Sequence, residues 1–248
     1  MFQFFVDKSQ IDESKGLVYI TGPDVNHISH VLRMKPGEQF YVTNGAREGK
    51  YLCALKSASQ EEVVCDITQV ITDTTELPCE IVLYQGLPKA DKMELIIQKA
   101  VELGASRIVP VETKHCVVKL DAKKAQSKIS RWQGIAEAAA KQSKRDVIPV
   151  IGNLMTLKEA LKEAADYEVS MMPYENAEGM AYTRKLLGEI RPGQRVAIFI
   201  GPEGGFDDGE VEAALSMGTK PVTLGRRILR TETAGLAILS MLVYVLEE

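Results

Sequence analysis

The chain has 248 residues, of which 45% are hydrophobic and 26% charged, and this length fits one large domain or a small domain with a medium one. The formal net charge of −4 argues against nucleic-acid binding through bulk charge, so any RNA contact needs a local basic patch. No run approaches the roughly 20 apolar residues needed to cross a bilayer, and the first residues lack signal-peptide features. These observations exclude a membrane protein and predict a cytoplasmic one.

Four cysteines are present, and none belongs to a C-x-x-C pair or stands at a zinc-ligand spacing from a histidine. We interpret them as structural thiols in a reducing compartment, and we expect no metal.

The first seventy residues are rich in short β-forming segments. Strands are predicted at 4–6, 17–20, 39–42, 51–55 and 62–67. One short helix is expected over 24–33, where Pro36 and Gly37 follow its end. This pattern indicates a small β-barrel over residues 1–72. The polar, turn-prone segment 73–78 is predicted to be a linker.

Strands and helices alternate from residue 79 to the end. Strands are predicted at 81–84, 107–111, 168–172, 195–200 and 221–224. Helices are predicted at 89–103, at 121–144, after a capping box formed by Thr156 and Glu159, and at 231–246. The last helix is apolar on nearly every face, so we expect it to be buried. The alternation predicts an α/β domain over 79–248 with a mostly parallel sheet.

Two loops that follow predicted strands are candidates for ligand binding, because open α/β sheets bind ligands beyond the carboxyl ends of their strands. The first loop, 200–206, holds three glycines and a proline, and its exposed backbone amides could bind an adenine edge or a carboxylate. Asp207 and Asp208 then cap the next helix. The loop matches neither a P-loop nor a dinucleotide fingerprint, and an ordinary strand-to-helix turn is the alternative.

The second loop, 224–234, carries three arginines directly before the apolar helix. They are Arg226, Arg227 and Arg230. Guanidinium groups at such a place need a phosphate, a carboxylate or an acidic side chain as partner. The alternative is a basic loop that forms salt bridges with a neighbouring subunit.

The two loops together resemble the signature pair of the ribosomal RNA small-subunit methyltransferase E family, and the segments 30–37, 89–105 and 138–145 are also similar to that family. The resemblance implies a C-terminal SPOUT domain threaded as a trefoil knot, an N-terminal PUA-like RNA-binding barrel and a homodimer. It further implies an enzyme of ribosome biogenesis that uses S-adenosyl-L-methionine (SAM) to methylate N3 of one uridine in 16S rRNA of the small ribosomal subunit. No metal is required.

The resemblance also implies a set of site residues. The loop 172–175 is expected to complete the cofactor pocket. The implied cofactor-binding residues are Met172, Pro173, Gly201, Pro202, Glu203, Gly204, Leu224, Gly225, Ile228, Leu229, Arg230 and Thr233. Arg230 is the candidate catalytic residue, because its guanidinium suits the negative charge that develops on uracil. Glu203 and Glu232 are alternative candidates as a base.

A basic segment is the RNA contact that the resemblance implies, whereas its charge alone would also fit a solvated helix face. Residues 112–145 hold nine Lys and Arg against three Asp and Glu. The predicted RNA-binding residues are Arg33, Lys124, Lys128, Arg131 and Arg145, and three of them share one helix face. Trp132 is predicted to anchor that helix in the core. The N-terminal segment lacks the arginine that the family often carries there, so RNA binding must do without it or use Lys8.

Three other readings remain open at this point. A SPOUT enzyme could methylate another RNA target, such as a ribose 2′-hydroxyl. A non-catalytic RNA-binding module would leave both glycine-rich loops unexplained. A nucleotide-binding α/β protein would lack the expected phosphate-binding fingerprint.

Overall fold

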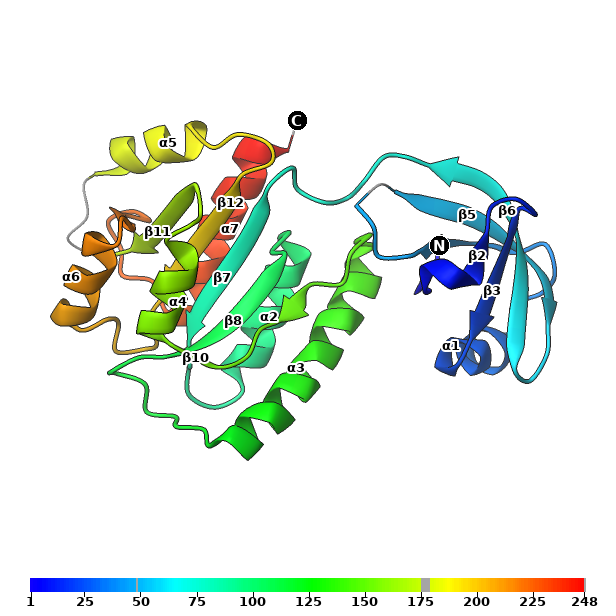
Figure 1. The fold of residues 1–248 in the computed structure, drawn as a ribbon, viewed down its shortest axis with the longest axis horizontal. Helices are drawn as coiled ribbons and strands as arrows, with labels where there is room; N and C mark the ends of the chain where they lie inside the picture. The colour runs from blue at the N-terminus through cyan, green and yellow to red at the C-terminus, as the bar shows by residue number, and fades with distance from the viewer. Residues whose placement is uncertain (48, 175–178, 248) are drawn as a thin grey trace. The chain divides into compact units, whose positions relative to one another are not determined.

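The computed structural model describes residues 1–47, 49–174 and 179–247. The chain forms two compact units: residues 1–76 with 140–148, and residues 77–139 with 149–248 (Figure 1). In the described part of the chain, no helix is both long and apolar enough to span a membrane.

The first unit is built on a six-stranded sheet with the order β1-β4-β5-β6-β3-β2. Its elements are β1 (Gln3–Phe5), β2 (Ile11–Asp12), β3 (Leu17–Thr21), α1 (Pro23–Asn26), β4 (Gln39–Thr43), β5 (Lys50–Ala58) and β6 (Glu62–Ile71), with short helical turns at Lys8–Gln10 and His27–Val31. The pairings are antiparallel except that β1 runs parallel to β4. Phe4 and Phe40 meet edge-to-face in the core, with ring centroids 5.2 Å apart. The five predicted strands are all present.

The segment 140–148 adds two buried ion pairs to this unit. Lys50 Nζ lies 2.8 Å from Asp146 Oδ1, and the guanidinium of Arg145 pairs with the carboxylate of Glu76. The Arg145 side chain is only 4% exposed and that of Glu76 only 1%. The guanidinium of Arg145 is thus enclosed and its charge compensated within this unit, which weighs against the predicted contact of Arg145 with RNA.

The second unit is built on a seven-stranded sheet with the order β10-β8-β7-β12-β11-β13 and β9 beside β8. Every pairing among its described strands is parallel. The strands are β7 (Glu80–Gly86), β8 (Arg107–Glu112), β9 (Val150–Ile151), β10 (Met155–Thr156), β11 (Val169–Pro173), β12 (Arg195–Ile200) and β13 (Lys220–Val222). The helices are α2 (Lys92–Glu102), α3 (Ala122–Ser143), α4 (Leu157–Ala164), α5 (Met180–Gly188), α6 (Asp208–Ser216) and α7 (Thr231–Leu246).

Helices cover both faces of this sheet, which explains why its central strands β7 and β12 are apolar on both sides (Figure 1). Val82 and Tyr84 of β7 point to the face that α4 and α6 cover. Leu83 and Gln85 alternate to the opposite face, where Gly235 of α7 lies close to both side chains. The predicted capping box at Thr156 and the predicted cap at Asp207 are both formed.

Helix α7 begins and ends where the sequence predicts, but only one of its faces is buried. Gly235, Ile238, Leu239 and Leu242 are enclosed against the sheet and α2. On the outer face, Tyr244 is 86% exposed and Val245 41%. The expectation that the whole helix is buried is therefore wrong within a single chain.

Candidate cofactor pocket

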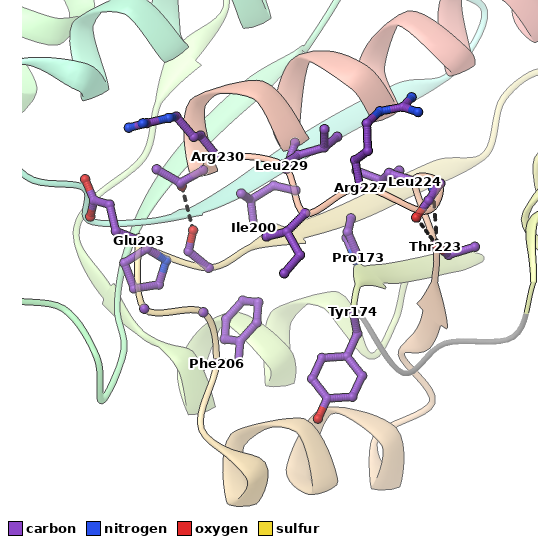
Figure 2. Close-up of a pocket in the computed structure, with 18 of the residues that line it drawn as sticks. Pro173, Tyr174, Ile200, Glu203, Phe206, Thr223, Leu224, Arg227, Leu229 and Arg230 are labelled. Atoms are coloured by element: carbon purple, nitrogen blue, oxygen red, sulfur yellow. Dashed lines mark hydrogen bonds between the residues drawn. The ribbon is translucent and has the colours of Figure 1, made fainter.

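A pocket of about 650 Å³ lies at the carboxyl edge of the parallel sheet, beyond β11, β12 and β13 (Figure 2). The three strands run parallel, so the loops that follow them meet at this edge. The pocket is lined by Lys92, Pro173, Tyr174, Ile200, Gly201, Pro202, Glu203, Gly204, Gly205, Phe206, Thr223, Leu224, Gly225, Arg226, Arg227, Ile228, Leu229, Arg230, Thr231 and Ala234.

The loop after β12 is tight enough to require its glycines. A Cβ on Gly201 would lie 3.0 Å from the carbonyl carbon of Gly205, and Gly205 has a φ of +67° that side chains disfavour. His115 packs against the outside of the loop, where its Nδ1 donates to the Gly204 carbonyl over 2.9 Å. These contacts leave little room for a side chain at Gly201 or Gly204, so the backbone of both residues stays accessible at the pocket.

The loop after β13 supplies apolar walls and a basic rim. Gly225 has a φ of +118°, and its N–H donates to Thr223 Oγ1 over 3.3 Å. Leu224, Ile228 and Leu229 follow as apolar lining residues, and the Ile228 side chain is 88% exposed. In Figure 2 the guanidinium groups of Arg227 and Arg230 point away from the aromatic rings of Tyr174 and Phe206.

The rim arginines are Arg226, Arg227 and Arg230, and all three are exposed. Within the described parts of the chain, none of them forms a salt bridge with a carboxylate, and the carboxylates at the pocket pair with Lys92 instead. An unpaired guanidinium beside a pocket is available to an anionic ligand group. The arrangement thus leaves Arg226, Arg227 and Arg230 free to meet a phosphate, a carboxylate or a developing negative charge.

Lys92 joins two acidic residues at one end of the pocket. Its Nζ lies 3.0 Å from Glu203 Oε1 and 3.3 Å from Glu232 Oε2. Partial burial acts to raise the pKa of Glu203, but hydrogen bonds from Lys92 and from the Lys89 N–H outweigh it, so the pKa is lowered. The backbone N–H of Glu232 and then Lys92 lower the pKa of Glu232. Both groups are carboxylates at neutral pH and weaker bases than an ordinary glutamate.

The structure brings most of the predicted cofactor residues to this pocket, but Met172 and Thr233 do not line it. The Met172 side chain is buried in the core beneath α4 and α6, and Thr233 is exposed in the first turn of α7. Within the loop 172–175, Glu175 lies outside the described residues. Sequence reasoning did not place Lys92 at the site, although it follows the carboxyl end of β7 closely. Phe206 and Thr231 lie within the two predicted loops but were not singled out as cofactor-binding residues.

The predicted RNA-binding residues of helix α3 are accessible to solvent, and each interacts with a neighbouring side chain. Lys124 pairs with Asp121, and Arg131 Nη2 lies 2.8 Å from Glu94 Oε1. Lys128 lies over the ring of Trp132, which is 3% exposed and does anchor the helix, as predicted. In the first unit, Arg33 is exposed at the end of the helical turn. These side chains can exchange weak surface partners for phosphates at small cost.

The fold and the pocket agree with comparisons to known families. A model of the RNA methyltransferase domain matches residues 75–243, and a model of the RNA methyltransferase PUA domain matches residues 20–68. The chain is therefore built as an RNA methyltransferase domain joined to a PUA domain.

Full-length relatives narrow this class. The chain is 37% identical to the ribosomal RNA small subunit methyltransferase E of Bacillus subtilis over 100% of its own length and 98% of that protein. It is 33% identical to the protein of the same name from Mesomycoplasma hyopneumoniae, over 97% of this chain and 98% of that one. The chain belongs to the ribosomal RNA small subunit methyltransferase E family, which confirms the resemblance drawn from the two loops.

Solved structures show the same fold. A ribosomal RNA small subunit methyltransferase E from Neisseria gonorrhoeae, bound to S-adenosyl methionine, has a TM-score of 0.81 and 31% identity, with 99% of this chain and 98% of that chain covered. A putative methyltransferase from Legionella pneumophila in complex with SAM has a TM-score of 0.82 and 30% identity, with 98% and 97% covered.

Proposed function

We propose that this enzyme transfers a methyl group from SAM to N3 of one uridine in 16S rRNA, within the assembled small ribosomal subunit. The observation that carries the proposal is the pocket that the two glycine-rich loops build together at the carboxyl edge of the sheet. The full-length relatives named as small-subunit rRNA methyltransferases support the substrate class. The cytoplasm, where such a substrate is found, is the proposed location.

The residues present fit SAM in size and in chemistry. A pocket of about 650 Å³ lies within the usual range for small-molecule sites. Leu224, Ile228 and Leu229 offer apolar surface to an adenosine, and the glycine backbone offers hydrogen-bonding groups to its edge. The charged groups at the pocket, cationic in the arginines of the rim and anionic in Glu203, suit the carboxylate and ammonium of an amino-acid tail. When bound, SAM supplies an electrophilic methyl group.

The protein's main tasks are to position the uracil and to balance its charge as the N3 proton leaves. Arg230 is the proposed catalytic residue, because its exposed guanidinium stays charged and can donate to a uracil carbonyl oxygen. The lowered pKa values of Glu203 and Glu232 make either a weak proton acceptor. Stabilising the negative charge on the base is therefore the favoured route over strong base catalysis.

The substrate must present the uridine out of its stack, since a stacked base cannot enter such a pocket. We propose that Arg33, Lys124, Lys128 and Arg131 bind phosphates of the surrounding RNA. We also propose the functional division into an RNA-binding barrel, residues 1–72, a linker, 73–78, and a methyltransferase domain, 79–248. Threading of the C-terminal segment as a trefoil knot belongs to this proposal and rests on the family resemblance.

A homodimer is the proposed assembly. Its support is the outer surface of α7, where Tyr244 and Val245 are exposed on a helix with few polar residues. A second copy packed on this face would remove that surface from water.

The test is transfer of a tritiated methyl group from SAM to small subunits that lack the modification, with the product mapped by reverse transcription. N3 methylation blocks the pairing edge, so a stop at one uridine is expected. Arg230→Ala should abolish both signals. Arg184→Ala, which removes an exposed arginine of α5 outside the pocket, is the matched control and should retain them.

Other outcomes would redirect the assignment. Incorporation without a stop would contradict N3 methylation and favour a ribose 2′-hydroxyl. No incorporation into subunits or free rRNA would overturn the enzymatic proposal in favour of an RNA-binding module. Equal loss in Arg230→Ala and Arg184→Ala would contradict the role given to Arg230.

A further inference from the structure

Gln85, the penultimate residue of β7, is a buried polar side chain to which the proposed reaction gives no role. It is 0% exposed, and its register partner in β12 is Ile200, directly before the first glycine-rich loop. Its Nε2 donates to the Gly86 carbonyl and to Thr231 Oγ1, each over 2.9 Å. Its Oε1 has no hydrogen-bond partner among the described residues.

The hydrogen bonds of Gln85 continue into the pocket wall. Thr231 Oγ1 donates to the Gly201 carbonyl over 2.6 Å, so the hydroxyl proton is committed and its oxygen can accept from Gln85. The Gly86 carbonyl can only accept, which fixes the amide with Nε2 towards it. The amide thereby links the end of β7, the first residue of α7 and the start of the loop after β12.

Two of these segments, the end of β7 and the loop after β12, are also in close contact. A Cβ on Gly86 would lie 2.7 Å from Pro202 Cδ and 2.8 Å from its backbone nitrogen. A shift of Thr231 or Gly201 therefore changes the spacing between the two pocket loops. Both residues line the pocket.

Stability alone gives little reason for a glutamine here. A buried acceptor without a partner costs free energy, and an apolar side chain of similar length avoids that cost. The neighbourhood suits such a side chain. A Cβ added to Gly235 would lie 3.8 Å from Ile200 Cγ1 and 3.9 Å from both Leu83 Cδ1 and Gln85 Oε1, so apolar atoms border the same space as the amide oxygen. What glutamine supplies, and methionine cannot, is the pair of N–H donors.

We propose that Gln85 is a positioning residue for the cofactor: it holds Thr231 against the Gly201 carbonyl and so fixes the distance between the two glycine-rich loops. This inference rests on the proposed use of the pocket for SAM. It assigns Gln85 an effect on SAM binding that exceeds its effect on stability.

The test is Gln85→Met, measured by calorimetric titration with SAM and by thermal unfolding without it. The Kd for SAM is expected to rise by about tenfold, while Tm stays the same or increases. Gln3→Met is the matched control, because Gln3 is also buried, donates from Nε2 to a backbone carbonyl and leaves Oε1 unpartnered among the described residues. It lies outside the pocket, so the Kd for SAM should not change.

Substitutions of Thr231 test the second hydrogen bond. Thr231→Ser keeps the hydroxyl and should bind SAM nearly as the wild type does, whereas Thr231→Val should weaken binding. Adding Gln85→Met to Thr231→Val should weaken it little further, because both changes break one linkage.

The Kd and Tm values of these variants distinguish a positioning role of Gln85 from a purely structural one. A wild-type Kd in Gln85→Met, or a tenfold loss in Gln3→Met as well, would overturn the positioning role. A large fall in Tm in Gln85→Met would reassign the residue to structural support. Failure of the wild type itself to bind SAM would instead sink the proposed function, and this inference with it.

Discussion

Replacing Arg145 by methionine is expected to destabilise the first unit strongly. The substitution leaves the Glu76 carboxylate, whose side chain is 1% exposed, without its counter-charge. Arg145 Nε donates to Glu76 Oε1 over 3.2 Å, and the backbone N–H groups of Asp146 and Val147 donate to the same oxygen. Among the described residues, the donors left to the buried carboxylate would then be these two backbone N–H groups.

The expected loss is roughly 3–5 kcal/mol of the free energy of unfolding, which is typical when one partner of a buried ion pair is removed. Arg131→Met is the matched control, since it also removes an arginine paired with a glutamate. The Arg131 side chain is 67% exposed, however, and exposed pairs contribute about 0–1 kcal/mol. Urea unfolding followed by circular dichroism measures both losses.

Adding Glu76→Gln to Arg145→Met should recover part of the loss, because a neutral amide is less costly to bury than a carboxylate. Equal losses for Arg145→Met and Arg131→Met would refute the argument from burial. If Arg145→Met folds and the salt-dependence slope of its RNA binding is smaller by about one unit, that result would support the RNA-binding role predicted for Arg145.

Two further predictions concern packing and thiol chemistry. Gly86→Ala should raise the Kd for SAM at least about tenfold or prevent folding, because the added Cβ meets Pro202. Gly188→Ala is the control: its Cβ would enter open space, so the free energy of unfolding should change by no more than about 1 kcal/mol. Titration with SAM and thermal unfolding would show whether the two variants differ. Burial raises the pKa of the Cys53 and Cys65 thiols from 9.0 to about 12. These thiols should resist alkylation at pH 8 until urea is added. Because the folded-state pKa is the higher one, stability should be full below pH 9 and fall as the pH rises towards 12; rapid native alkylation would contradict this.

The local hydrophobic pattern of the sequence was enough to place most of the longer helices and strands. The strand at 195–200 and the helix at 231–246 have the predicted bounds. In both, the local sequence marks where the element starts and ends, because the strand is a continuous apolar run and the helix an uninterrupted helical segment. In the second unit, the prediction omitted α5 (Met180–Gly188) and the two-residue strands β9 and β10. Those strands exist only through pairing with β8, which local sequence does not reveal.

Much of the candidate site was also accessible from the sequence, because a parallel sheet gathers the loops after its strands at one edge. The glycine-rich loops and the rim arginine Arg230 were predicted on that basis and from the resemblance. Lys92 was not, since its significance depends on Glu203 and Glu232, which lie more than 100 residues away in the chain.

The sequence by itself determined the α/β rhythm, the β-rich first unit and the two loops that line the pocket, because each is encoded by residues close together in the chain. Only the tertiary structure decided which charged and polar groups are free to act. Arg145 and Arg131 belong to the same basic segment, yet Arg145 is enclosed with Glu76, 69 residues away, and Arg131 faces solvent. Burial and pairing depend on distant partners, so the availability of a charge is a property of the folded chain.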